Sequence, residues 1–457
     1  MKKQKIYCFL AGAVLMASLA ACGGGAKESS ASGTSGKTEA ESGKEESSGK
    51  AEASDSADSG SIRMSWWGGD SRHEATLKAL DAYMAENPGV KIESEYGAWS
   101  GWTDKIATQL AGASAPDVLQ INWNWIYQFS SDGKGFYDLK QSKDDFDFSQ
   151  YDENLLEQMT IDGKLQAIPI ATTGKAFFWN QQTWEKAGLS VPKSFSELLA
   201  AGPIFKEKLG DDYYPMAAGE YDLMMLLTYY MQESYDKPWV ENGAISYTKD
   251  ELADGFDFLK KLEENHVIPS QEKMKGDGAD SIDKNPNFID GHYAGLYEWD
   301  SAVSKMQGAL ADGQTLVLGE YPADYGKPST IYKISMGFAL SKDTKNPKAD
   351  LKLLDYLLNG EGVKTLGLER GIPASKAAQK TLSEEGKLEG LVYEANKAAS
   401  ENYRFTLSPY YEDSKLKDPS EGAYYEIMDN MSYDHEDSKE LAQQMIDAVN
   451  ELESSKA

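Results

Sequence analysis

Hydrophobic and polar positions follow two alternating periods along the body of the chain, one of two residues and one of about 3.6 residues. The first short-period run places Ile62, Met64 and Trp66 on every second position. We expect these three side chains to face a core while Ser65 and Trp67 face the other side of a strand. Two glycines follow Trp67 and end the run.

Strand-like and helical segments then continue to alternate. Helical spacing of apolar residues over 73–86 lies between strand-like runs at 62–67 and 90–96, which predicts a βαβ unit. The pattern also predicts strands at 116–121, 164–170 and 175–179 and helices at 194–208, 251–265, 348–358 and 439–452. This alternation predicts an α/β fold of the doubly wound kind.

The first residues have the pattern of a secretion signal. Lys2, Lys3 and Lys5 precede an apolar stretch from Ile6 to Ala17 that is short for a membrane span. The following Leu-Ala-Ala-Cys sequence ends at Cys22 and resembles the bacterial lipoprotein signal. That resemblance implies that residues 1–21 are removed and that Cys22 carries the lipid, such as palmitate. The alternative is a buried cysteine after an ordinary signal peptide.

A polar linker follows the signal. From Gly23 to Gly60 the sequence contains no Val, Ile, Leu, Phe, Tyr or Trp, so this stretch cannot bury enough surface to order itself. The chain as a whole carries a formal net charge of −28. A body this acidic is not expected to bind nucleic acid or to adhere electrostatically to an anionic membrane.

Cysteine usage limits what can hold the body together. Cys8 lies in the signal, so the mature chain keeps only Cys22 and forms no internal disulfide. Stability must come from hydrophobic cores, and the roughly 400 residues after the linker are enough for two domains.

The sequence contains no pattern typical of a catalytic or metal centre. Its four histidines are far apart, and nucleophile elbows, phosphate loops and dinucleotide fingerprints are absent. Acidic pairs at 144–145 and 211–212 are expected by chance in a chain with 74 Asp and Glu. The loop that starts at Asp277 lacks the Gly and Glu of an EF-hand, having Ile282 and Phe288 there. We expect no enzyme activity, no cofactor and no metal.

Several motifs occur in an order that resembles a known family. SWWGGD, NPGVKIESEY, AGASAPDVLQI, GKLQAIPI, GLYEWDSAV and ERGIPAS are similar to the extracellular solute-binding proteins of ABC sugar importers. Within that family, SWWGGDSRH, QINWNW, GFYDL, FKEKLGDDYYP and LVLGEYP look most like the binding proteins for oligogalacturonides, the acidic fragments of pectin.

The resemblance implies a periplasmic-binding-protein-like fold of type II, with two α/β lobes around a ligand cleft. It places hinge crossings near 170–174, 322–329 and 367–371, with closure by hinge motion. The expected organisation is a signal peptide at 1–21, the acylated Cys and linker at 22–60, an N-terminal lobe at 61–171 plus 329–366, and a C-terminal lobe at 172–328 plus 367–457.

Aromatic and amide side chains gather at predicted strand ends, where open α/β sheets present ligand-binding groups. A sugar needs an aromatic platform for its apolar face and planar hydrogen-bonding groups for its rim. Trp66 or Trp67, Trp123 and Trp299 are the preferred platforms, although each tryptophan has core packing as its alternative. The candidate ligand-binding residues are Trp66, Trp67, Asp70, Arg72, His73, Trp99, Trp102, Asn122, Trp123, Asn124, Lys175, Glu220, Tyr221, Trp299, Asp300 and Arg370.

Cations in the cleft would select acidic over neutral sugars, because a carboxylate removed from water needs a partner. Arg72 and Arg370 lie in motifs that the family places near the cleft, and Lys175 stands where the oligogalacturonide binders carry an arginine. The alternatives are a salt bridge from Arg72 to Asp70 or Glu74 and a helix-end charge for Arg370.

Three hypotheses for function follow. The first is a lipid-anchored, monomeric receptor on the outer face of the cell membrane that captures oligosaccharides, such as oligogalacturonides or a neutral plant oligosaccharide. It would deliver them to ABC permease subunits. The second is a secreted glycan-degrading enzyme or lyase, and the third is a surface adhesin for polysaccharide.

Overall fold

One long strand, β6 (Ile168–Asn180), organises the fold in the computed structural model, which describes residues 60–279 and 281–456. All 13 of its residues are buried. Its first half pairs in antiparallel fashion with β11 (Tyr332–Leu340) and β12 (Ile372–Pro373), and its second half with β9 (Gly295–Trp299) and β10 (Leu316–Leu318). The predicted break between two strands at 170–174 is wrong, because partners on both sides keep the strand continuous.

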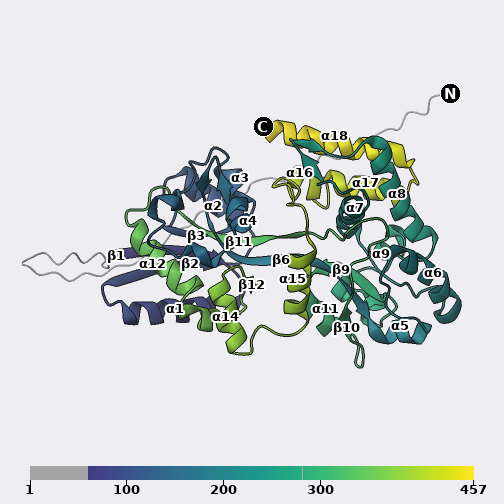
Figure 1. Ribbon diagram of the computed structural model, residues 1–457, viewed down its shortest axis with the longest axis horizontal. Coiled ribbons are helices and arrows are strands. Elements are labelled where there is room, and N and C mark those ends of the chain that lie inside the picture. Colours follow the sequence, from purple (N-terminus) through teal and green to yellow (C-terminus); the bar gives the residue numbers. More distant parts are fainter. Residues whose placement is uncertain (1–59, 280, 457) are drawn as a thin grey trace, which may run out of the picture. The chain divides into compact units, whose positions relative to one another are not determined.

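The first hydrophobic core surrounds three parallel strands, β1 (Gly60–Trp67), β2 (Val90–Gly97) and β3 (Val118–Asn122). Helix α1 (Asp70–Glu86) connects β1 to β2, so the predicted βαβ unit is confirmed. β11 joins the same sheet antiparallel to β3 and gives the order β10-β6-β11-β3-β1-β2 (Figure 1).

The second half of strand β1 is buried on both faces. Ile62, Met64 and Trp66 are in the core as expected, with the exposed Ser61 and Arg63 alternating with them at the start of the strand. Ser65 and Trp67 face the other side of the strand as expected, but they are buried as well, with Trp67 only 7% exposed.

Helices from distant parts of the sequence complete this first region. α12 (Pro347–Leu358) and α13 (Gly362–Leu366) pack against α1. The predicted helix at 348–358 is therefore confirmed. The other elements here are α2 (Trp102–Ala111), α3 (Trp125–Phe129), α4 (Glu153–Gln158), β4 (Thr160–Ile161), β5 (Lys164–Leu165) and α14 (Lys376–Glu384).

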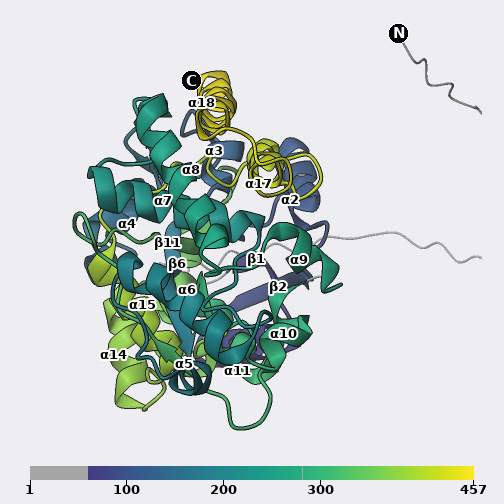
Figure 2. The ribbon, with the colours of Figure 1, turned by 90° about the vertical axis from the view of Figure 1, so that its right-hand side faces the viewer.

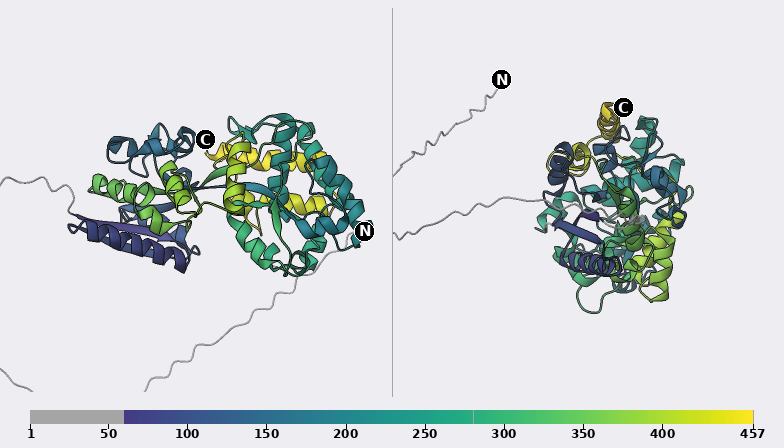
Figure 3. Two further views of the ribbon diagram at one scale, coloured as in Figure 1. Left: turned by 60° about the horizontal axis from the view of Figure 1, so that its bottom comes forward. Right: turned by 90° about the vertical axis from the view of Figure 1, so that its left-hand side faces the viewer.

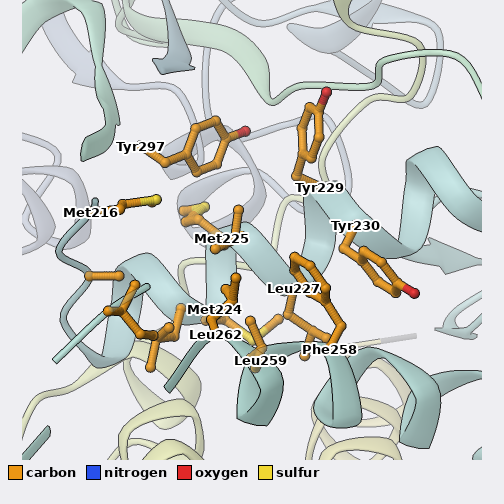
Figure 4. Close-up of a cluster of buried hydrophobic side chains, with 14 of the residues drawn as sticks. Met216, Met224, Met225, Leu227, Tyr229, Tyr230, Phe258, Leu259, Leu262 and Tyr297 are labelled. Carbon is orange, nitrogen blue, oxygen red and sulfur yellow. The ribbon is translucent and has the colours of Figure 1, made fainter. Parts of the chain in front are cut away.

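The second hydrophobic core is mainly helical. α7 (Glu220–Tyr235), α8 (Lys249–Glu264), α17 (Ala423–Ser432) and α18 (Ser438–Lys456) pack side by side, as Figures 1 and 2 show. Figure 4 shows Met224 and Leu227 of α7 facing Leu259 and Leu262 of α8, and Met225 pointing toward Met216 and Tyr297. The other elements are α5 (Gln181–Ala187), α6 (Phe195–Leu209), β7 (Val240–Glu241), β8 (Ala244–Ile245), α9 (Gln271–Gly276), α10 (Pro286–Ile289), α11 (Val303–Ala309), α15 (Leu391–Asn402) and α16 (Ser414–Lys417).

Local sequence explains why α8 begins where it does. The Thr248 hydroxyl accepts from the Glu251 amide, and the Glu251 carboxylate accepts from the Thr248 amide. This reciprocal capping box satisfies two helix-end donors. Leu252, Phe256 and Leu259 then recur on one face and are fully buried, so the cap and the apolar face specify the same helix.

Residues of β6 contribute to both cores and those of β11 to the first, and Figure 3 shows strands passing between the two groups of helices. The lobe boundaries given above stay a prediction. Within residues 60–279 and 281–456, no helix combines the length and hydrophobicity that a membrane span requires. The predicted signal peptide, Cys22 and nearly all of the linker lie outside the described residues.

Candidate functional site

Three tryptophans meet at the carboxyl ends of the parallel strands. Trp67 ends β1, Trp99 follows β2, and Trp125 begins α3 just after β3. The ring centroids of Trp67 and Trp99 are 5.1 Å apart, and those of Trp99 and Trp125 are 5.7 Å apart and stacked. Trp67 and Trp125 are buried, whereas Trp99 is 50% exposed. Trp99 is therefore the member of this group that offers a ring face to a ligand.

A buried lysine lies between two further tryptophans. The ammonium of Lys333, on β11, is 4.9 Å from the ring centroid of Trp123 and 5.2 Å from that of Trp299. Trp123 follows β3, and Trp299 ends β9. Such contacts stabilise a cation through the electron-rich ring faces. The structure thus brings two of the three preferred platform tryptophans together around a cation that the sequence analysis did not select.

The carboxylate of Glu412 completes this cluster. It accepts a hydrogen bond from Trp123 Nε1 at 3.0 Å and is paired with Lys333. It also accepts from the Tyr221 hydroxyl at 3.2 Å and from Lys417 Nζ at 2.6 Å. These partners come from β11, α7, α16 and the loop after β3, so one carboxylate connects residues of both hydrophobic cores.

Burial and charge act in opposite directions on this cluster. Burial alone would raise the pKa of Glu412, but the charges and hydrogen bonds of Lys333 and Lys417 outweigh it and hold that pKa well below its usual value. Burial lowers the pKa of Lys333 and exceeds the opposing effect of Glu412. Glu412 is therefore ionised at neutral pH and supplies the charge that Lys333 needs in the interior.

A second charged cluster surrounds Lys175. Its ammonium donates to Asp222 Oδ1 at 2.7 Å and to the Tyr297 carbonyl at 2.9 Å, and Glu298 lies 3.7 Å away. Burial would lower the pKa of Lys175, but the two carboxylates raise it overall. The Lys175 ammonium also lies 5.6 Å from the Trp299 ring centroid, so Trp299 contacts the cations of both clusters.

A cleft of about 850 Å³ opens beside the Glu412 cluster. One wall contains Trp99, Asn122 and Asn124 from the strand-end loops, and the opposite wall is formed by residues 409–419. Asn122 donates to Asn124 at 2.9 Å. The cleft is large enough for a ligand of several rings. Amide groups, an exposed tryptophan and charged side chains line it.

The candidate residues divide by position. Trp99, Asn122 and Asn124 line the cleft. Trp123, Tyr221 and Trp299 instead contact Glu412 or Lys333 of the adjoining cluster, and Trp123 is only 2% exposed. Asp70 lies exposed at the start of α1, and Glu220, at the start of α7, pairs with Lys275 at 2.8 Å. Their roles in binding stay predictions.

Other candidates are held in the interior. Trp66 is fully buried, stacks on Tyr96 and donates to His73 Nδ1 at 3.1 Å. Trp102 is 3% exposed and packs in the first core. Asp300 accepts from Thr173, the Gly174 amide and Asn396, and burial raises its pKa. These contacts are sufficient to explain their burial as packing.

The two arginines among the candidate residues, Arg72 and Arg370, lie near each other and are hydrogen-bonded within the protein. Arg72 Nε donates to the Glu369 carbonyl at 2.9 Å and Arg72 Nη1 to the Trp67 carbonyl at 3.1 Å, rather than to Asp70 or Glu74. Arg370 is 7% exposed and donates to Gln120 Oε1 at 2.8 Å. Burial and the neighbouring Arg72 lower the pKa of Arg370 to about 9. The expected roles of Arg72, Arg370 and Lys175 as cations that select an acidic sugar stay predictions.

Sequence analysis missed Lys333, Glu412 and Lys417. Lys333 had a signal, because a lysine inside the apolar run IYKISMGF predicts a buried and therefore partnered charge. Glu412 had none, since its partner Trp123 is 289 positions away. Among the described residues, no group of His, Cys, Asp and Glu is arranged to hold a metal ion.

A family model described as bacterial extracellular solute-binding protein matches residues 69–364. The chain belongs to this family. This solute-binding protein is also 28% identical over 160 residues to a curated binding protein of Brucella abortus, an alignment that spans 35% of this chain and 39% of that relative. A diacetylchitobiose binding protein of Streptomyces coelicolor is 26% identical over 201 residues, which cover 43% of this chain and 41% of that one.

Solved structures match over a longer stretch. A periplasmic oligogalacturonide binding protein from Yersinia enterocolitica, in complex with saturated digalacturonic acid, has a TM-score of 0.75 and 35% identity over 87% of this chain and 99% of its own. A periplasmic solute binding protein of Pectobacterium atrosepticum has a TM-score of 0.78 and 35% identity over the same shares. The predicted two-lobed, type II α/β fold is confirmed.

A de novo designed cysteine esterase is also similar, with a TM-score of 0.82 and 35% identity over 87% of this chain and 98% of its own. The solute-binding protein described here has cysteines only at positions 8 and 22, before the first strand. The body therefore lacks a cysteine nucleophile, and that designed activity does not transfer to it.

Proposed function

We propose that this solute-binding protein captures acidic oligosaccharides of the oligogalacturonide class and delivers them to the membrane subunits of an ABC importer. The single observation that carries the proposal is the position of Lys333 against Trp123 and Trp299, where it pairs with Glu412 on the cleft wall. Aromatic faces suit the apolar face of a sugar ring, and a buried ammonium suits a uronate carboxylate.

Two further observations support an acidic ligand. Lys417 adds a second ammonium to the same cluster. The Yersinia enterocolitica relative is an oligogalacturonide binding protein whose structure contains digalacturonic acid, and its similarity extends over nearly the whole body of this chain. A neutral oligosaccharide would use the same rings and the amides of Asn122 and Asn124 but would leave the lysine charges unused.

The proposal extends to location and assembly. The protein acts as a monomer on the outer face of the cell membrane, held by a lipid on Cys22, and binds its ligand without cleaving it. Support for the anchor comes from the Leu-Ala-Ala-Cys sequence and the polar linker that follows it. Support for binding without catalysis comes from the solute-binding family.

A thermal-shift screen tests the proposal. A ligand that binds only the folded protein raises the melting temperature with the logarithm of its concentration. We expect di- and trigalacturonate to raise it and neutral galactose, glucose and xylose oligomers of equal length to do so less. The same samples should show no new reducing ends or unsaturated products. A larger shift with a neutral oligomer contradicts the acidic ligand, and cleavage products favour an enzyme.

A further inference from the structure

The carboxylate of Glu412 stands where the carboxylate of an acidic ligand would be recognised. Its two oxygens accept from Trp123 Nε1, Lys333, Tyr221 and Lys417. The side chain is 10% exposed and lines the cleft. Bonds to a charged acceptor gain strength away from water, so this cluster has the properties of a built anion-binding site that a side chain of the protein occupies.

The charges in this cluster do not balance. Lys333 and Lys417 together carry two positive charges, and Glu412 supplies one negative charge. In the part of the chain that the structure describes, Glu412 is the carboxylate that pairs with either lysine. The cluster therefore keeps a net positive charge beside the cleft, in a chain whose formal net charge is −28. The excess is local to Lys333 and Lys417, because Asp104, Asp413 and Asp418 also line the cleft.

We propose that Glu412 is a specificity-determining residue that competes, as an internal carboxylate, with a uronate carboxylate of the ligand for Lys333 and Lys417. This inference rests on the proposed function, because it assigns the step that lets the cleft select acidic sugars. A ligand carboxylate replaces Glu412 at Lys333 and restores the pairing of the buried ammonium. A neutral sugar cannot restore it, since displacement of Glu412 would leave Lys333 unpaired in the interior.

The local structure allows such an exchange without refolding. Glu412 lies in a segment between α15 and α16 that contains no helix or strand. The neighbouring Tyr411 is buried and its hydroxyl lies 2.6 Å from that of Thr228, which fixes the backbone beside Glu412. Lys417 is 36% exposed on the cleft wall. Rotation of the Glu412 side chain can therefore carry it outward with Lys417 while its backbone stays in place.

The exchange also explains the position of Trp123. Its indole Nε1 donates to the same Glu412 oxygen that pairs with Lys333. When the ligand carboxylate takes that place, the indole N–H and the ammonium remain available as a matched pair of donors for its two oxygens.

The test is isothermal calorimetry of Glu412→Gln with trigalacturonate and with a neutral galactose trisaccharide. Glutamine keeps the size of the side chain and removes the competing charge. We expect the Kd for trigalacturonate to fall at least about tenfold and the Kd for the neutral sugar to change by less than about threefold. The matched control is Glu320→Gln, which removes the charge of an exposed glutamate that pairs with Lys193. It should change neither value.

Thermal melting establishes that each variant is folded. Glu412→Asp is the second variant, because it keeps the charge but shortens the reach toward Lys333. It should lower the Kd for trigalacturonate by less than Glu412→Gln does. An unchanged or higher Kd of Glu412→Gln for trigalacturonate overturns the inference, as does an equal gain for the neutral sugar. Failure of the wild-type protein to bind trigalacturonate would instead overturn the proposed function.

Discussion

The ammonium of Lys333, on β11, lies 4.9 Å from the ring centroid of Trp123, and both side chains are buried. The ring stabilises a cation that suits a ligand carboxylate, while the exposed Trp99 on the cleft wall suits the apolar face of a sugar. Trp299 covers the same ammonium from another strand end. This arrangement is the physical basis of the proposed preference for acidic oligosaccharides.

Lys333→Met tests the role of the charge. Methionine keeps much of the length of the side chain and removes the ammonium. Binding of trigalacturonate should weaken by about 2 to 5 kcal/mol, since the ligand carboxylate loses its desolvated partner, whereas binding of a neutral trisaccharide should change little. Calorimetry measures both. Lys342→Met, at an exposed position, is the matched control for net charge. Equal losses for the two sugars would show that Lys333 supports the fold of the cleft rather than ligand charge.

Trp99→Ala tests the exposed platform. The ring is 50% exposed on the cleft wall, so its removal should cost about 1 to 3 kcal/mol of sugar binding with little loss of stability. Tyr325→Ala is the control, because this tyrosine is 68% exposed and is not among the residues that line the cleft. An unchanged Kd for Trp99→Ala would place the sugar elsewhere in the cleft.

Sequence patterns predicted the parts of the fold that depend on local order. The helices expected at 194–208, 251–265, 348–358 and 439–452 all occur, with ends shifted by a few residues at most. The continuous strand β6 was missed because its continuity comes from partners more than 100 positions away, at β9 and β11. Burial of Ser65 and Trp67 on the second face of β1 was also missed.

The candidate site shows the same division. Trp99, Asn122 and Asn124 were selected because parallel strands end at one edge of a sheet, and the structure places all three on the cleft. Lys333 and Glu412 were missed because their pairing joins positions 79 apart and no local motif connects them. Arg72 and Arg370 were selected for their charge and for motifs that the family places near the cleft, and their partners are backbone carbonyls, Gln120 and Thr76.

Asp350→Asn tests a buried carboxyl group that affects stability with pH. Burial raises the pKa of Asp350 to about 7, far above the value of an unfolded aspartate, about 3.9. Between these values the folded protein holds a proton that the unfolded chain has lost, so this group's contribution to the free energy of unfolding falls as pH rises. Asparagine keeps an acceptor for the Thr344 hydroxyl.

Melting temperatures of wild type and Asp350→Asn from pH 5 to pH 8 measure this effect. The melting temperature of the variant should rise relative to that of the wild type by several degrees as pH increases toward about 7, because the variant carries no charge to bury. A constant difference across this range would show that Asp350 does not titrate there. Asp343→Asn, at an exposed position, is the control.

Cys22→Ala tests the anchor. Without a thiol at this position no lipid can be attached, so the protein should move from the membrane fraction to the medium. Immunoblots of both fractions measure the distribution, and Cys8→Ala is the matched control within the signal. Retention of the Cys22 variant on the membrane would contradict a lipid anchor at Cys22.

Calorimetric titration of the wild-type protein with trigalacturonate and a neutral galactose trisaccharide tests the central claim most directly. The account predicts that trigalacturonate binds at least about tenfold more tightly than the neutral sugar. Its affinity should fall as the salt concentration rises, because Lys333 and Lys417 bind the ligand carboxylate through charge. Tighter binding of the neutral trisaccharide, or equal affinity for both, would contradict it.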